Sequence, residues 1–545
     1  MKKYLLIFVV MPFCLSISQN LDSLYNEFIK LKGISHGHGN INVREESNPV
    51  KCSFGIVNSI KLNYEKFSPL QKSVLSPLLA RPVLDTSIVS PLGYFRIHFN
   101  KSGINAPAYD IKLFAAAADS AYNYEVKIIG FPPPPKDNGA GGDDLYDIYI
   151  KDLSAEYGYT EFENSITSNT FTSYMVLDND FAGNNYNTHG IDAARVTVAH
   201  EFNHGIQIGN YIYRQEDNYY YELTSTSMEE FVFSGVNDYY YYIKYYFQNP
   251  GRTITSNSSW YDGYDLALWN IFLKDRFGIG SIKKIWELMP SKRALQCFDD
   301  MFKGENSNFK VEFNNFALWC YFTGTRAVAG KYFSEASAYP SINPAALINS
   351  VSVNSEAASN SYFLFTDNSS SPGNALVSII SNCDIEGGIV SSAAITPFTF
   401  TVASAPISGG SHIVDKYYSK LESKNDLALS LFSQSNIFNN IPVNEGHIIA
   451  QETDYAFPQP FKYSLYNQIY FPAAATSSGY ADLNIYSIDM NLVFSGSKRI
   501  LATDKIAVGW DALDLRGSKL STGVYFFITK SGDTVKKGKF VIYND

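Results

Sequence analysis

Two histidines and a glutamate within one short stretch could together hold and use a metal ion. His200, Glu201 and His204 lie in the run AHEFNHG, inside a segment expected to be helical. The spacing of four places both imidazoles on one face of a helix, where both can reach a single tetrahedral zinc ion. Glu201 would lie beside the metal and could accept a proton from its water as a carbonyl is attacked. The pattern therefore predicts hydrolysis by a metal-activated water.

A third ligand is expected further along the chain, because catalytic zinc usually takes three protein ligands and leaves one position open. Glu222 begins a second helical segment, in which Glu229 shares its face. We expect Glu222 to bind the metal and Glu229 to orient one of the ligands from behind. Glu229 as the ligand in place of Glu222 is the alternative, because spacing does not decide between close carboxylates. Glu230 is equally well explained as part of a solvated face.

Hydrolysis also needs a hydrogen-bond donor for the oxyanion that forms on the attacked carbonyl, often a tyrosine or a histidine. Tyr261 and Tyr264 precede a predicted helix at 266–277 and follow the second ligand segment, so either could return to the metal. Tyr264 is the candidate we name, although the chain has 40 tyrosines and a structural role is the competing explanation. His189, just before the ligand helix, is expected to be a loop residue.

The elements that must position these residues follow from the periodicity of the apolar residues. Alternation predicts strands at 93–99, 145–150 and 173–177, and a longer period predicts a helix at 110–130. Helices are expected to dominate from residue 191 to about residue 333. This order of strand, helix, strand, strand and helix predicts an α+β fold.

The same region resembles a family of enzymes. An HExxH motif followed by a more distant glutamate is similar to the gluzincins, which include thermolysin-like peptidases and zinc aminopeptidases. The segments 130–137, 141–149, 200–207 and 222–230 more closely resemble a group of secreted bacterial metallopeptidases named from myxobacterial genomes. The resemblance covers residues 90 to 340, roughly, and implies that Glu222 is the glutamate ligand.

The resemblance further implies that the strand at 145–150 or the strand at 173–177 is an edge strand lining the cleft. An extended peptide could pair with such an edge through main-chain hydrogen bonds. The chain departs from the family around the glutamate, where the usual aromatic residue and alanines are replaced by Tyr221, Leu223, Ser225 and Ser227.

Downstream of Ser341, Ser/Asn/Gly/Thr-rich turns separate short apolar runs, which predicts all-β sandwich domains. Near the C-terminus, Trp510-Asp511 and Gly523-Val524-Tyr525 lie among alternating runs. These elements resemble the sorting domain of type IX secretion cargo, which is similar to the immunoglobulin-like domain of a flagellar hook-capping protein. That resemblance implies export across an outer membrane with the secretion machinery as a partner. A β-sandwich module that contacts polysaccharide or another protein is the alternative.

At 545 residues the chain is too long for one hydrophobic core. Lys2 and Lys3 precede a short apolar run, which is typical of an export signal. A lipid anchor on Cys14 is the alternative, and the bulky Phe13 before that cysteine disfavours it. We expect a signal peptide at 1–18, an N-terminal extension or pro-segment at 19–91, a gluzincin-like zinc metallopeptidase domain at 92–345, a β-rich accessory domain at 346–462 and an immunoglobulin-like sorting domain at 463–545.

The four cysteines beyond the predicted signal match no zinc-ribbon or CxxC spacing. A bridge between Cys297 and Cys320 is conceivable, and buried free thiols explain these residues equally well. Cys52 could be an inhibitory thiolate ligand of the zinc in a pro-segment, although no motif supports this. Calcium binding is a weak expectation for acids that lack an EF-hand pattern and are better explained as solvated; these acids are Asp143, Asp144, Asp147, Asp178 and Asp180.

Charge and composition narrow the function. The net charge of -10 and the absence of a basic stripe argue against a nucleic-acid partner. No segment after the predicted signal is apolar enough to span a bilayer. His36 and His38 lie in a Gly-rich stretch without a third donor and are left out of the site. The sequence thus predicts a secreted or cell-surface, zinc-dependent peptidase, with endopeptidase action expected, that acts on proteins or peptides. The alternative is a catalytically inactive surface adhesin or binding protein with the same fold.

Overall fold

The protein is described from a computed structural model. It describes residues 11–32, 50–154, 156–183, 186–256, 263–347, 358–366, 374–383, 397–406, 416–423, 444–445, 454–466, 468–474, 480–502 and 506–544. The chain forms two compact units, one built mainly from residues up to Met301 and the other mainly from Phe302 onwards. Each unit is described by itself. Among the described residues, no helix combines the length and apolar character that crossing a membrane requires.

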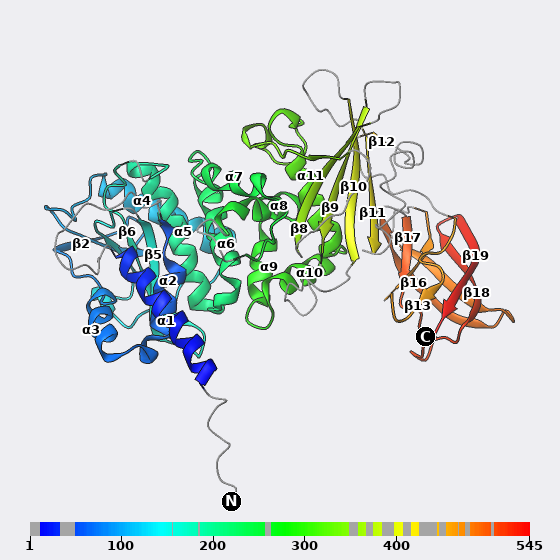
Figure 1. The fold of residues 1–545 in the computed structure, drawn as a ribbon, viewed down its shortest axis with the longest axis horizontal. Coiled ribbons are helices and arrows are strands. Elements are labelled where there is room, and N and C mark those ends of the chain that lie inside the picture. Colours follow the sequence, from blue (N-terminus) through cyan, green and yellow to red (C-terminus); the bar gives the residue numbers. More distant parts are fainter. Residues whose placement is uncertain are drawn as a thin grey trace, which may run out of the picture. The chain divides into compact units, whose positions relative to one another are not determined.

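A mixed six-stranded sheet lies at the centre of the first unit (Figure 1). Its order is β1 (Val50–Cys52), β5 (Glu156–Ser165), β6 (Phe171–Leu177), β4 (Tyr146–Ile150), β3 (Phe95–Phe99) and β2 (Thr86–Val89). β5 runs antiparallel to β6, whereas β1 runs parallel to β5. The strands predicted at 93–99, 145–150 and 173–177 are confirmed as β3, β4 and β6.

The expected edge strand is corrected by this topology. β4 and β6 both lie inside the sheet with a strand on each side, so neither offers a free edge. Sequence reasoning missed β1, β2 and β5, and of these β5 carries Glu161 and Glu163 among its aromatic residues. β5 would be an edge strand if β1, contributed by the N-terminal part of the chain, did not pair with it.

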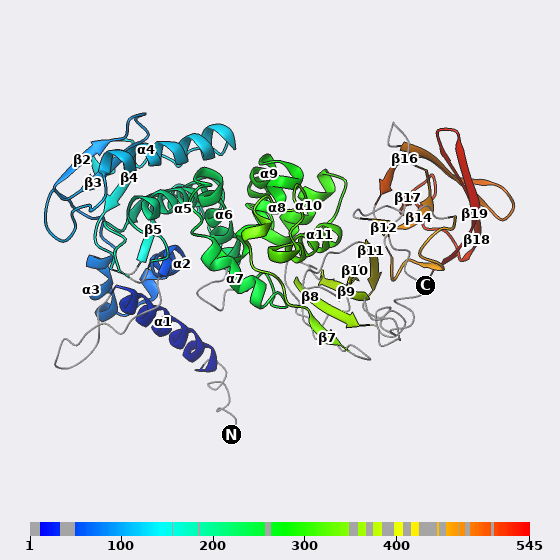
Figure 2. The ribbon, with the colours of Figure 1, turned by 90° about the horizontal axis from the view of Figure 1, so that it is seen from above.

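Helices cover both faces of this sheet (Figure 2). α5 (Gly190–Asn210) packs on β5 and β6, with α4 (Ile111–Tyr122) beside it. On the other face, α1 (Met11–Leu31), α2 (Phe54–Leu62) and α3 (Pro69–Leu78) share a core with Tyr159 and Tyr174. Because side chains alternate along a strand, Gly158 and Thr160 of β5 face α5.

The helix-rich stretch predicted from residue 191 onwards is confirmed. After α5 come α6 (Asn218–Val232), α7 (Tyr240–Gln248), α8 (Ala267–Phe277), α9 (Gly280–Leu288) and α10 (Ala294–Gly304). α6 packs between α5 and α8. Most of its side chains are buried, including Tyr220 and Met228, so a polar residue on this helix lies in the protein interior.

The second unit begins with a helix and continues as β-structure. α11 (Phe309–Tyr321) packs on β9 and β10 of an open sheet, where the Asn314 amide donates to the Ser381 hydroxyl at 3.0 Å. The strand order is β12 (Asn444–Glu445), β11 (Lys416–Ser423), β10 (Pro397–Pro406), β9 (Asn374–Asn382), β8 (Ser359–Thr366) and β7 (Ala345–Leu347).

The C-terminal strands enclose a separate apolar core. They are β13 (Phe461–Lys462), β14 (Ile469–Pro472), β15 (Tyr480–Ser487), β16 (Leu492–Ala502), β17 (Ile506–Trp510), β18 (Gly523–Ser531) and β19 (Thr534–Tyr543). β16 pairs with β15 in one layer and with β17 in the other, and Phe471, Trp510 and Phe540 meet between the layers. The α+β class with separate β-domains is therefore confirmed.

Candidate metal site

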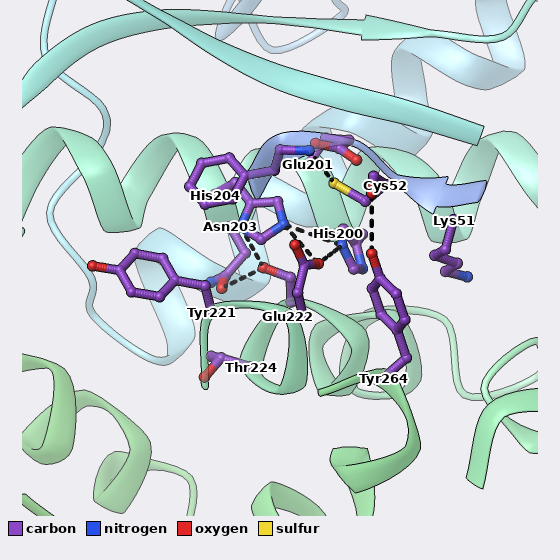
Figure 3. Close-up of polar contacts among 12 residues, drawn as sticks. Lys51, Cys52, His200, Glu201, Asn203, His204, Tyr221, Glu222, Thr224 and Tyr264 are labelled. Atoms are coloured by element: carbon purple, nitrogen blue, oxygen red, sulfur yellow. Dashed lines mark hydrogen bonds and ion pairs between the residues drawn. The ribbon is translucent and has the colours of Figure 1, made fainter. Parts of the chain in front are cut away.

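Helices α5 and α6 bring together the three side chains expected to bind a metal (Figure 3). The Nε2 atoms of His200 and His204 lie 3.2 Å apart. Glu222 Oε2 lies 3.2 Å from the first and 3.3 Å from the second. Zinc bonds of about 2.0–2.1 Å in a tetrahedron would hold such atoms about 3.3–3.4 Å apart. The donor set therefore fits a metal ion in both chemistry and spacing.

A further donor belongs to the same group. Cys52, His200, His204 and Glu222 are all buried, and one ligand atom from each lies within 4.8 Å of all the others. This buried group could hold a metal ion. Burial first, and then the charges of Glu201 and Glu222, raise the pKa of the Cys52 thiol well above its usual value. A bound cation would reverse this effect, because coordination deprotonates a thiol.

The outer nitrogen of each imidazole is held by another side chain. His200 Nδ1 lies 2.8 Å from Glu229 Oε1, and His204 Nδ1 lies 2.8 Å from Gln207 Oε1. An acceptor at Nδ1 keeps the proton there and leaves Nε2 free to bind a metal. Glu229 thus lies behind His200, as expected, and its carboxylate does not belong to the ligand group.

Charge within the cluster favours a cation. Burial alone would lower the pKa of His200, but hydrogen bonds to Glu222 and Glu229 raise it to about 9. Burial would raise the pKa of Glu222, yet His204 and His200 lower it to about 2. The carboxylates therefore draw positive charge into a site that is closed to water, and a divalent ion could supply that charge.

Glu201 lies beside the ligand group, on the side of β5. The Thr160 hydroxyl donates to Glu201 Oε2 at 2.8 Å, and burial raises the pKa of this carboxyl. Close approach of α5 to β5 requires a glycine at position 158, because an added Cβ would lie 2.9 Å from Thr197 Cγ2 and 3.3 Å from Glu201 Cγ. The strand thus fixes the position of the Glu201 carboxylate.

Tyr264 reaches the cluster from a short turn that precedes α8. Gly263 has a φ of +93°, and an added Cβ there would lie 2.8 Å from Glu222 Cβ. This close approach to α6 brings the Tyr264 ring to 5.9 Å from the His200 ring. Its hydroxyl donates to the backbone carbonyl of Cys52 at 3.1 Å. Tyr264 therefore lies beside the candidate ligands, and Tyr261 lies outside the described residues.

The other candidates from the sequence lie away from the cluster or outside the described residues. His189 precedes α5, and its Nδ1 lies 2.9 Å from the Phe181 carbonyl, so it is a loop residue as expected. Cys297 and Cys320 are both buried and form no disulfide bridge with each other. His36 and His38 fall outside the described residues.

The acids considered for calcium are engaged by protein groups. Asp147 pairs with Arg81 and His98, and Asp178 accepts the amides of Leu153 and Phe181. Asp147 and Asp178 are each 1% exposed, so the expectation that they are solvated is wrong. Asp143 pairs with Arg96 and Asp144 with Lys136, while Asp180 accepts the Ala182 amide. In the part of the chain that the structure describes, these acids form no metal-ligand group.

Comparison with known proteins leaves the function open. No protein-family model and no curated protein matches the chain. Similar solved structures include dimeric latent PorU from Porphyromonas gingivalis, with 14% identity and a TM-score of 0.13, covering 34% of this chain and 20% of PorU. PorZ, a surface component of the type IX secretion system of the same bacterium, has 10% identity and a TM-score of 0.13, covering 34% of this chain and 37% of PorZ.

A third similar structure is the neural ectodermal development factor IMP-L2, with 11% identity and a TM-score of 0.11. That match covers 34% of this chain and 79% of the factor. The chain spans less than two thirds of PorU and of PorZ. Identities and TM-scores at this level assign neither a family nor an activity.

Proposed function

We propose that the protein is a zinc-dependent peptidase that hydrolyses peptide bonds with a metal-activated water. The observation that carries this proposal is the spacing of three donor atoms, on His200, His204 and Glu222, at 3.2–3.3 Å from one another. A structural carboxylate cluster needs neither this tetrahedral spacing nor an adjacent base. Glu201, buried beside the donors and held by Thr160, supplies that base.

Each residue of the site has its own role in the proposed hydrolysis. A zinc ion held by His200, His204 and Glu222 would polarise the peptide carbonyl and acidify a water molecule. Glu201 accepts the proton and passes it to the leaving amine, and its burial favours this exchange because the raised pKa suits a general base. Tyr264 donates a hydrogen bond to the developing oxyanion.

The proposal includes export to the cell surface or medium. It is supported by the signal-like start of the chain and by the Trp510-Asp511 and Gly523-Val524-Tyr525 elements of the C-terminal β-sandwich. Trp510 is fully buried in the core of that sandwich, so its presence is explained by folding as well as by sorting. Fusion of residues 463–545 to a reporter carrying a signal peptide, in a bacterium with a type IX system, tests the sorting role. Retention of the reporter in the periplasm would contradict it.

The test of the enzyme measures zinc by elemental analysis and cleavage of an unfolded protein mixture. Because Cys52 lies against the cluster, cleavage is measured with Cys52 present and in the Cys52→Ala background. We expect one zinc per chain and chelator-sensitive cleavage in the Cys52→Ala background, lost by about 10²–10⁴-fold on Glu201→Gln because the general base is removed.

A matched control is Glu161→Gln. Glu161 is also a buried glutamate, but it faces the opposite side of β5 and pairs with Lys61. Its replacement should leave zinc content and cleavage unchanged. Zinc without cleavage in any background would favour the inactive binding protein, and a chain without zinc would refute the metal site.

A further inference from the structure

The chain itself offers a fourth possible donor beside the three expected metal ligands. Cys52 Sγ belongs to the same group of ligand atoms as the two histidines and Glu222. The Phe54 amide donates to this sulfur at 3.3 Å and keeps it turned toward the cluster. Thiolate sulfur is a strong zinc ligand, and a zinc ion with four protein ligands has no open position. With Cys52 in place, the site has the composition of a closed centre.

The strand that carries Cys52 also covers the edge at which a substrate would pair. β1 aligns Cys52 with Gly158 of β5, and the Ser53 amide donates to the Gly158 carbonyl at 3.4 Å. β5 is the strand whose Thr160 contacts Glu201. A peptide that approached Glu201 by adding to β5 would need the hydrogen bonds that β1 now makes.

The proposed oxyanion donor is occupied by the same segment. The Tyr264 hydroxyl donates to the Cys52 carbonyl, as Figure 3 shows. The segment thus presents a backbone carbonyl to Tyr264 and a sulfur atom to the metal ligands. A bound peptide would use both positions during hydrolysis, so the segment and the peptide exclude one another.

Two side chains anchor the segment on either side of Cys52. The Phe54 ring stacks on the His204 ring with centroids 4.0 Å apart and planes at 2°, and it is 0% exposed. Lys51 is 3% exposed, and its Nζ donates to Glu229 Oε2 at 2.8 Å and also contacts Asp238. Both anchors lie against residues of the metal site or directly behind them.

We propose that Lys51–Phe54 is a built-in inhibitory segment, in which the Cys52 thiolate is the fourth metal ligand and keeps the peptidase latent. This inference rests on the proposed function. Binding transfers the thiol proton to solvent and forms a metal–sulfur bond. Activation would break that bond when the segment leaves, the sulfur would regain a proton from solvent, and water would enter both the metal position and the β5 edge. No oxidation or reduction is involved.

Ligation is tested on the full mature chain by loading it with Co²⁺ in place of zinc. A cobalt–thiolate bond gives a near-ultraviolet sulfur-to-metal charge-transfer band, so the readout does not depend on activity. We expect the band in the wild type, its loss in Cys52→Ala with the cobalt still bound, and its retention in Cys297→Ala. Cys297 is the matched control because it is also a buried free thiol. A wild-type chain that binds cobalt without the band overturns the proposal.

Latency is tested by cleavage of an unfolded protein mixture. We expect Cys52→Ala to cleave at least 10-fold faster than the wild type and Cys297→Ala to match the wild type, with ~10-fold corresponding to about 1.4 kcal/mol. Equal rates for wild type and Cys52→Ala overturn latency. If no variant cleaves although the band follows Cys52, the proposed peptidase fails while the thiolate ligand stands, which identifies a closed structural metal centre.

Discussion

Two regions of the molecule meet at the candidate metal with opposite expected effects. Helices α5 and α6 supply the donors and the base, whereas the segment Lys51–Phe54 covers them. The donors come from neighbouring helices, at separations that helix geometry fixes. The covering thiol comes from the N-terminal part of the chain and reaches the site only because β1 pairs with β5. The candidate donors are thus placed by two neighbouring helices, whereas the proposed control of access depends on a long-range contact.

The two regions also differ in how they are held. The polar groups of α5 and α6 lie in a buried network, in which His200 alone touches both Glu222 and Glu229. Removing one member leaves its buried partners without a hydrogen bond or an opposite charge, which lowers the stability of the folded state. The segment is held by a stacked ring, a buried ion pair and a few backbone hydrogen bonds. Changes in the helices should therefore abolish function, and changes in the segment should release it.

The largest effect is expected for His204→Ala. Loss of a histidine donor should lower zinc affinity by more than the 10–100-fold that loss of an outer hydrogen-bonding partner typically costs. Calorimetric unfolding with and without added zinc measures this, because a ligand that binds only the folded state raises its stability. We expect zinc to raise the unfolding temperature of the wild type and not that of His204→Ala. His189→Ala, which replaces a histidine outside the cluster, should behave as the wild type.

A smaller effect is expected for Glu229→Gln. This carboxylate accepts the Nδ1 proton of His200, so its replacement should weaken zinc binding by about 10–100-fold. Glu230→Gln is the control, since burial raises the pKa of Glu230 to about 8 and this carboxyl lies outside the ligand group. Competition with a chromophoric chelator measures both affinities. Equal zinc affinity in the two variants would show that the hydrogen bond behind His200 does not support the metal.

Sequence reasoning placed the helical part of this site well. His200, Glu201 and His204 lie on one helix, so their relative positions follow from its 3.6-residue period. Glu222 and Glu229 follow from the same rule within α6. What remained undecided was which carboxylate faces the metal, because that depends on how α6 packs against α5. The packing directs Glu222 toward Nε2 and Glu229 toward Nδ1.

Sheet order and the position of Cys52 could not be predicted in the same way. Alternation identified β4 and β6 as strands but carries no information on which strand is next to which. β5 escaped notice because Glu161 and Glu163 interrupt its aromatic run, and the structure explains Glu161 by its buried pair with Lys61 of α2. Cys52 carries no motif, and it reaches the candidate metal ligands through the long-range pairing of β1 with β5.

The smallest effect is expected for Lys51→Met, which tests the segment without touching a metal donor. Loss of the ammonium removes the buried pair with Glu229 and Asp238 and leaves both carboxylates without this cation while the segment is docked. This loss destabilises the state in which the segment is docked, so part of the population should release it. We expect a weaker cobalt–thiolate band and a few-fold faster cleavage than in the wild type.

Lys61→Met is the matched control for this prediction. Lys61 lies on α2, in the same N-terminal part of the chain, and also forms a partly buried pair with a glutamate, Glu161. That pair lies on the face of the sheet opposite α5, so its loss should reduce stability without freeing the metal. If Lys51→Met and Lys61→Met changed the band and the cleavage rate equally, general destabilisation would explain both results. Lys51 would then stabilise the fold as a whole and not specifically the docked segment Lys51–Phe54. It would no longer support the distinction between helices that bind the metal and a segment that covers it.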